Sequence, residues 1–197
     1  MKMNKIAVAT GFALALCAGA ANAGPLASGA GKTVTVNGGT VHFQGKLVAA
    51  PCAVSDDTSD QTVKLGEYTT HHFAKKGSLG VVKPFEIKLE DCDTSTASSA
   101  AVAFSGIADA TDPTLLAINQ DDSTSGSATA TGVAIKIMDN ASKIVKLDGS
   151  TFTDKTTILD GDNTPALKFT AQYVGVSDSG ATGGDANADV NFIMQYQ

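Results

Sequence analysis

The chain has 197 residues and a formal net charge of −6, and it contains neither arginine nor tryptophan. An acidic chain without arginine is poorly suited to neutralising a phosphate backbone, so we expect no nucleic-acid binding. Glycine is plentiful and charged residues make up only 17% of the chain, which is typical of a β-rich domain outside the cytoplasm.

Residues 1–23 have the pattern of a secretory signal peptide. Lys2 and Lys5 precede an apolar stretch that is too short to span a bilayer, and the segment ends in Ala21-Asn22-Ala23. Removing these 23 residues from 197 leaves a mature chain of 174, beginning at Gly24. No later segment is apolar enough to anchor it, so we expect an exported chain that does not span a membrane.

Residues 24–40 precede the predicted main domain, residues 41–197, as an N-terminal extension. The apolar residues change phase at Gly38-Gly39: Val34 and Val36 occupy even positions, whereas Val41, Phe43 and Leu47 occupy odd ones. One straight strand cannot bury both sets on the same face. A hairpin turning at Asn37-Gly38 would solve this. So would two extended segments, with 32–40 buried elsewhere and 41–49 in the domain's own core. Periodicity favours the hairpin slightly and does not decide.

Two cysteines remain once Cys17 leaves with the signal peptide. In an oxidising compartment we expect Cys52 and Cys92 to form a disulfide. On the chain-entropy model, closing a loop of this length stabilises the fold by about 4 kcal/mol. A metal-binding or reactive pair would need a nearby histidine or a short C-x-x-C spacing, and neither is visible.

Short alternating segments predict the strands of an all-β domain. They include residues 85–90, the apolar positions 133, 135 and 137, and residues 167–173. Turn signals separate them at Asp148-Gly149, at 160–163 and at 177–184. No amphipathic helix of useful length appears. The pattern favours a single sandwich of immunoglobulin type.

The last fourteen residues show the clearest alternation. One face is apolar and the other polar, apart from Ile193; the apolar face comprises Ala186, Ala188, Val190, Phe192, Met194 and Tyr196. This period of two is that of a half-buried strand. A strand of this kind needs neighbours for its edge groups, so the sequence leaves open which strand lies beside it.

Several segments resemble type 1 fimbrial major subunits of the chaperone–usher pilin family. The matching segments follow in the expected order over nearly all of the mature chain: residues 35–45, 51–54, 60–66, 87–93, 100–104 and 186–197. The family's C-terminal hallmark is a penultimate tyrosine with a glycine fourteen residues from the end. Tyr196 and Gly184 satisfy it.

The resemblance implies an incomplete immunoglobulin-like sandwich that lacks its last strand and is completed by donor strand complementation. A periplasmic chaperone would first lend a strand, and the extension of the next pilin subunit would replace it during export through an outer-membrane usher. The donor residues would be Val34, Val36, Gly38 and Thr40, with the charged Lys32 departing from the pattern. The receiving C-terminal strand would present Gly184, Ala188, Val190, Phe192, Met194 and Tyr196.

The sequence therefore predicts a structural subunit of a fimbrial rod at the cell surface, with identical or related subunits as partners. We expect no catalysis, cofactor or metal. His71-His72 could suggest a metal site, but adjacent strand residues point to opposite faces, so a solvated turn is the better interpretation. A minor adaptor subunit and, less favoured, an autonomous periplasmic β-sandwich remain as alternatives.

Overall fold

The computed structural model describes residues 35–118, 128–159 and 164–197. The predicted signal peptide, Lys32 and Val34 lie outside these ranges. The chain divides into two units, residues 1–45 and 46–197, which are considered separately. Residues 46–197 hold all the strands of the described chain, so the folded domain lies in this second unit.

The larger sheet of the domain has five antiparallel strands in the order β1-β2-β7-β5-β4. Their bounds are β1 Ala53–Val54, β2 Lys83–Glu90, β4 Leu116–Ala117, β5 Val133–Asp139 and β7 Ala166–Gly175. The strands predicted at 85–90, 133–137 and 167–173 lie within β2, β5 and β7. The two-residue strands β1 and β4 are too short to give an alternating signal, and sequence periodicity missed them.

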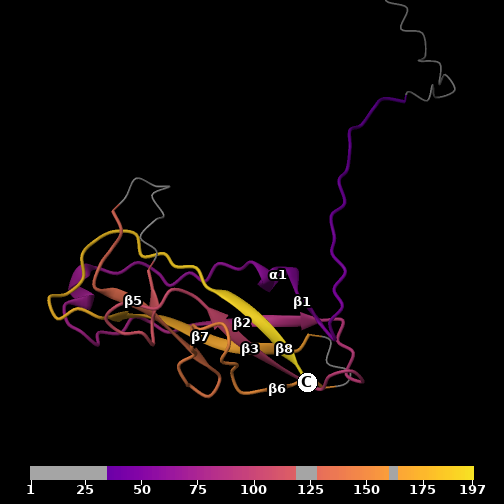
Figure 1. Ribbon diagram of the computed structural model, residues 1–197. Coiled ribbons are helices and arrows are strands. Elements are labelled where there is room, and N and C mark those ends of the chain that lie inside the picture. The colour runs from indigo at the N-terminus through magenta and orange to yellow at the C-terminus, as the bar shows by residue number, and fades with distance from the viewer. Residues whose placement is uncertain (1–34, 119–127, 160–163) are drawn as a thin grey trace, which may run out of the picture. The chain divides into compact units, whose positions relative to one another are not determined.

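The smaller sheet has three strands in the order β6-β3-β8. Their bounds are β3 Ser99–Ser105, β6 Thr156–Thr157 and β8 Asn191–Tyr196. The two sheets pack as layers of a sandwich (Figure 1). The helices of the described residues are single turns: α1 Asp56–Ser59 and the 3₁₀ helix η1 Thr70–Phe73. The predicted all-β architecture is confirmed.

The core lies between the two sheets and is built from alternate strand residues. In β2, Ile87 is 1% exposed and Leu89 is fully buried, since these odd positions face inward. The ring of Phe169 on β7 stacks on Phe85 of β2 at 5.4 Å and meets the ring of Phe104 on β3 edge-on at 5.1 Å. Aromatic contacts of this geometry stabilise the packing of the two layers by more than the burial of apolar area alone.

Helix α1 ends the pairing of the chain with β2. The β1–β2 ladder stops at Val54, and α1 follows two residues later. Side chains then replace the ladder: the Thr58 hydroxyl accepts from the Lys88 amide at 3.1 Å, and the Gln61 amide donates to the Glu86 carbonyl at 2.9 Å. The chain beyond Gln61 is thereby free to leave β2 and run along the edge of the sandwich.

Candidate functional site

An open groove of about 940 Å³ runs along one edge of the domain. One wall is residues 58–67, named here the α1 wall, and the other is residues 186–192, named the β8 wall. The floor comes from strands of both sheets and is apolar: Phe85, Ile87, Phe104, Leu116, Ile135, Ile137 and Ala171, with Tyr173 at one side. The groove thus opens directly onto the hydrophobic core.

Beyond helix α1, the α1 wall is extended chain that belongs to no sheet. Residues 62–67 form no strand, and among the described residues none makes a backbone hydrogen bond to them. Gln61, Val63 and Leu65 are partly buried, whereas Asp60, Thr62 and Lys64 are exposed. This alternation is that of a strand with its own partner missing. The Val63–Leu65 spacing is the sequence signal that could have indicated this wall.

The β8 wall shows the alternation expected of the C-terminal segment. Its inward residues pack against the core and remain only partly buried: Ala186, Ala188, Val190 and Phe192, followed along β8 by Met194 and Tyr196. The exception of the pattern, Ile193, lies on the outer face and is 48% exposed. Because β8 is the last strand of its sheet, its edge away from β3 pairs with no described strand.

Gly184 holds the start of this wall close to the chain before β5. The amide of Ala130 donates to the Asp185 carbonyl, and the amide of Asp185 donates to the Ala128 carbonyl, both at 2.9 Å. A β-carbon on Gly184 would lie 2.5 Å from the Ala130 nitrogen and closer still to the Ala128 oxygen. Only glycine allows this approach without displacing backbone. The predicted position of Gly184 therefore has a packing reason.

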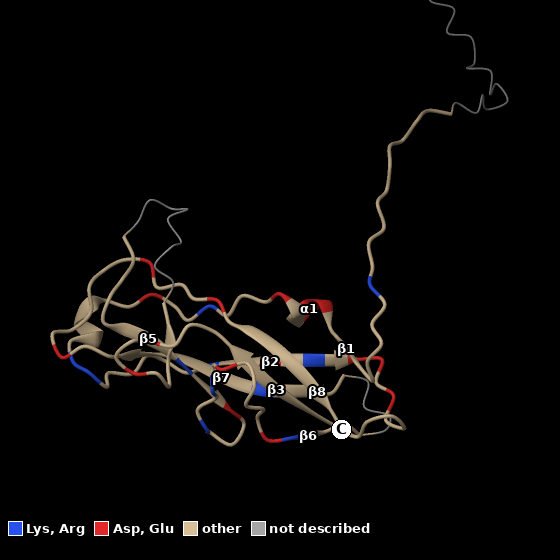
Figure 2. Ribbon diagram, viewed as in Figure 1, with Lys and Arg blue, Asp and Glu red and all other residues tan. Residues whose placement is uncertain are grey.

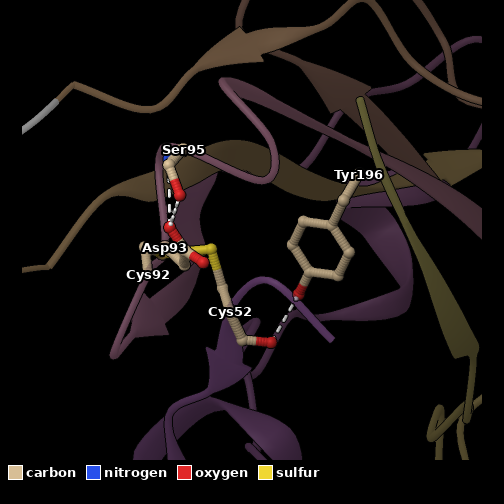
Figure 3. Close-up of a disulfide and its surroundings, with 5 residues drawn as sticks. All are labelled: Cys52, Cys92, Asp93, Ser95 and Tyr196. Carbon is tan, nitrogen blue, oxygen red and sulfur yellow. Dashed lines mark hydrogen bonds between the residues drawn. A yellow bond between two sulfur atoms is a disulfide. The ribbon is translucent and has the colours of Figure 1, made fainter. Parts of the chain in front are cut away.

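The disulfide and the penultimate tyrosine meet at the opposite end of the wall. Cys52 and Cys92 are bonded, which confirms the predicted pairing. The Tyr196 hydroxyl donates to the Cys52 carbonyl at 3.3 Å, so the last strand is joined to the start of β1 (Figure 3). Beside the bridge, the hydroxyl of Ser95 donates to the carboxylate of Asp93 and is the main cause that lowers the pKa of that group.

Tyr173 connects the floor of the groove to the β8 wall. Its hydroxyl donates to the Ala186 carbonyl at 2.6 Å, and its ring meets those of Tyr68 and Phe73 edge-on. Burial raises the pKa of the Tyr173 phenol, because the charged form would lose hydration. The neutral Tyr173 therefore holds the β8 wall in place at Ala186, ahead of the first residue of strand β8, Asn191.

Residues 35–45 span the end of the extension, residues 24–40, and the first residues of the predicted domain; this segment is extended chain with exposed side chains. The exposed fraction is 76% for Val36, 74% for Val41 and 92% for Phe43, and Leu47, just beyond it, is fully exposed. Residues 41–45 belong to the first unit and the chain from Lys46 to the second, so the contribution of residues 41–49 to the domain's own core stays a prediction. No strand pairing occurs among residues 35–50, so the described chain does not form the alternative hairpin.

Of the two adjacent histidines, His72 makes both a packing contact and a hydrogen bond. The ring of His72 packs on Phe73 and hydrogen-bonds the Leu79 carbonyl at 2.9 Å. Within the described ranges, no three His, Cys, Asp or Glu residues are grouped to hold a metal ion. The helices of the same ranges are too short to cross a membrane.

A sandwich with an apolar groove between two walls whose facing edges pair with no described strand has the geometry that receives an extended segment by strand addition. A family model described as fimbrial protein matches residues 41–197. The chain is 51% identical over 164 residues to the type 1 fimbrial subunit of Salmonella typhimurium, which covers 83% of this chain and 85% of that protein. It is 42% identical over 198 residues, the full length of both chains, to the type 1 fimbrial protein A chain of Escherichia coli K12. The chain belongs to the fimbrial protein family.

Solved structures agree with this assignment. A subunit from the structure of a chaperone–usher pilus matches with a TM-score of 0.67 and 27% identity, covering 85% of this chain and all of that one. The crystal structure of the P pilus rod subunit PapA shares the fold, with a TM-score of 0.60, 23% identity and 75% of this chain covered. The recognition of a fimbrial structural subunit from sequence motifs is therefore confirmed, as is its pilin-type sandwich.

Proposed function

We propose that the chain is a subunit of a fimbrial rod and polymerises head to tail, each subunit placing its N-terminal extension in the groove of a neighbour. The observation that carries this is a pair of complementary defects in one chain. The domain has an apolar groove without a strand, and the extension has exposed apolar side chains without a core. A contact between two different surfaces does not close on itself, so it propagates into a filament.

The free energy for this assembly comes from two sources. Apolar surface in the groove costs on the order of 25 cal/mol for each Å² that stays in water. An added strand covers that surface and also pairs with the open edge of β8. The β8 wall, residues 186–192, is about 20 Å of extended chain. An added strand that pairs along its whole length therefore needs about seven residues.

Either face of the donated segment could point into the groove: the face of the even-numbered residues or the face of the odd-numbered residues. The sequence-based proposal places Val34, Val36, Gly38 and Thr40 inward; Val34 lies outside the described residues, and the other three are exposed. The odd face carries Val41, Phe43 and Leu47, with Gly45 among them, and these side chains are exposed as that of Val36 is. These three side chains offer more apolar surface than the even set, so we propose them as the principal anchors.

The receiving residues proposed are those of the terminal segment: Gly184, Ala188, Val190, Phe192, Met194 and Tyr196. A periplasmic chaperone would occupy this groove before assembly, since the open edge of β8 and its partly buried apolar side chains would otherwise stay in water. The family and the signal-like segment 1–23 support the proposed export through the periplasm and an outer-membrane usher. The proposed role is structural and not catalytic.

The two alternatives differ from a rod subunit in different ways: an adaptor in its copy number in each fimbria, and an autonomous protein in needing no strand from a partner. A minor adaptor would be present in few copies for each fimbria, which quantitative immunoblotting of purified fimbriae measures. An autonomous sandwich protein would be complete without a partner. The open edge of β8 argues against that alternative, because a complete domain would pair this edge and cover the partly buried Val190 and Phe192 itself.

The test is assembly by cells that express single-residue variants. Phe43→Asp should abolish fimbriae and the multimers that survive detergent, because a carboxylate cannot enter an apolar groove without a partner. Val36→Asp tests the even face in the same way. Ile144→Asp is the control, since Ile144 is 45% exposed but lies away from the groove. Normal fimbriae with both Phe43→Asp and Val36→Asp would refute the proposed function.

A further inference from the structure

Charge is divided unevenly between the extension and the domain. Residues 24–49 contain two lysines, Lys32 and Lys46, and no acidic residue. Residues 50–197 contain the other ten lysines of the mature chain and all 20 acidic residues, a net charge of −10. The segment proposed to enter the groove is therefore opposite in sign to the domain that receives it.

Acidic residues stand on both walls of the groove. Asp60 and Glu67 lie on the α1 wall and Asp189 on the β8 wall, and all three are exposed. Glu67 also faces an adjoining hollow of about 500 Å³, together with Asp185. Among the described residues that line the groove, Lys64 is the one lysine. Figure 2 shows further acidic residues at α1, where the α1 wall begins.

The alternation of the β8 wall fixes where these charges would meet an added strand. Inward positions are apolar, and the outward positions 185, 187, 189 and 191 carry two aspartates and two asparagines. The outward side chains of an added strand would lie directly beside them. In residues 32–46, the polar residues on either face are neutral or basic: Lys32, Thr33, Thr35, Asn37, Thr40, His42, Gln44 and Lys46.

We propose that the acidic walls of the groove steer and select the basic extension of a second copy of this chain. The inference rests on the proposed function and adds its specificity. Opposite charges on neighbouring strands are favourable and like charges unfavourable, so a donor strand with acidic outward residues is rejected. Exposed charges act over about 8 Å at physiological salt, which raises the rate of productive encounter more than the final affinity.

The experiment follows assembly of the full mature chain, residues 24–197, started from monomer. The initial rate of formation of detergent-resistant multimers is measured at about 20 mM and about 500 mM NaCl, concentrations that bracket the screening of surface charges. We expect the wild-type rate to be about tenfold lower at high salt. The variant K32E/K46E should be slow at both salt concentrations. Adding Asp60→Lys and Asp189→Lys to K32E/K46E should restore a fast, salt-dependent rate.

The matched control is Lys146→Glu with Lys155→Glu, which changes the net charge equally. Both lysines are exposed and neither lines the groove, and Lys155 directly precedes β6, at the sheet edge opposite β8. The control should keep the salt dependence of the wild-type chain. A wild-type rate independent of salt, an equally slow control, or no rescue by the reversed walls would overturn the inference while leaving strand donation intact. Absence of multimers from wild-type chain at any salt would refute strand donation as well.

Discussion

The Cys52–Cys92 bridge should supply a large part of the stability of the unassembled domain. Its partners are separated by 40 residues, for which the chain-entropy model gives about 4 kcal/mol. Ordinary domains have a net stability of about 5–15 kcal/mol, and this one leaves its groove open. Replacing both cysteines by alanine avoids burying a hydroxyl at Cys52, which is 3% exposed.

The assay is urea unfolding of the purified mature chain as a monomer. The double alanine variant should unfold at a much lower midpoint, with a loss of about 4 kcal/mol after extrapolation to water. Reduction of the wild-type chain by dithiothreitol should reproduce the loss, and the variant itself should not respond to the reductant. In cells, Cys52→Ser should lower the level of periplasmic subunit. A loss below about 1 kcal/mol would show that the reduced chain is held by packing alone and that the loop-closure reasoning fails.

Three further outcomes are expected. Gly184→Ala should destabilise the domain by about 1–3 kcal/mol in thermal unfolding, because the added methyl meets the backbone at Ala130. The control Gly183→Ala, whose β-carbon would have one neighbour at 3.9 Å, should change little, and equal effects would refute the packing explanation of the hallmark glycine. Phe192→Asp should prevent multimers, whereas Ile193→Asp, on the opposite face of β8, should allow them. The reverse result would show that the outer face of β8, and not the face that carries Phe192, receives the added strand. Finally, burial raises the pKa of Tyr173, so the folded state binds its proton more tightly than the unfolded state and stability should fall as pH rises above about 10. Tyr173→Phe should show a shallower fall between pH 9 and pH 11 in melting temperature, with identical slopes counting against the contribution of Tyr173.

Local patterns were sufficient for strands with clear alternation, but not for β3, whose residues 100–104 are all buried and do not alternate. Ile87 and Leu89 in β2, and Val133, Ile135 and Ile137 in β5, alternate over enough residues to indicate both strand and inward face. The bridge followed from compartment and cysteine count. The α1 wall was missed, because its alternating signal is as short as Val63 and Leu65. In addition, α1 and the side chains of Thr58 and Gln61 interrupt the pairing with β2.

The amino-acid sequence by itself determined the sandwich class, the disulfide, the inward face of the terminal strand and the likeness to fimbrial subunits, since each depends on spacing along the chain. Only the tertiary structure showed that an apolar groove lies beside β8, between two walls whose facing edges pair with no described strand. The physical reason is that an alternating apolar segment must be covered by something, but its sequence does not state whether the cover belongs to the same chain. That depends on which strands the rest of the fold leaves open.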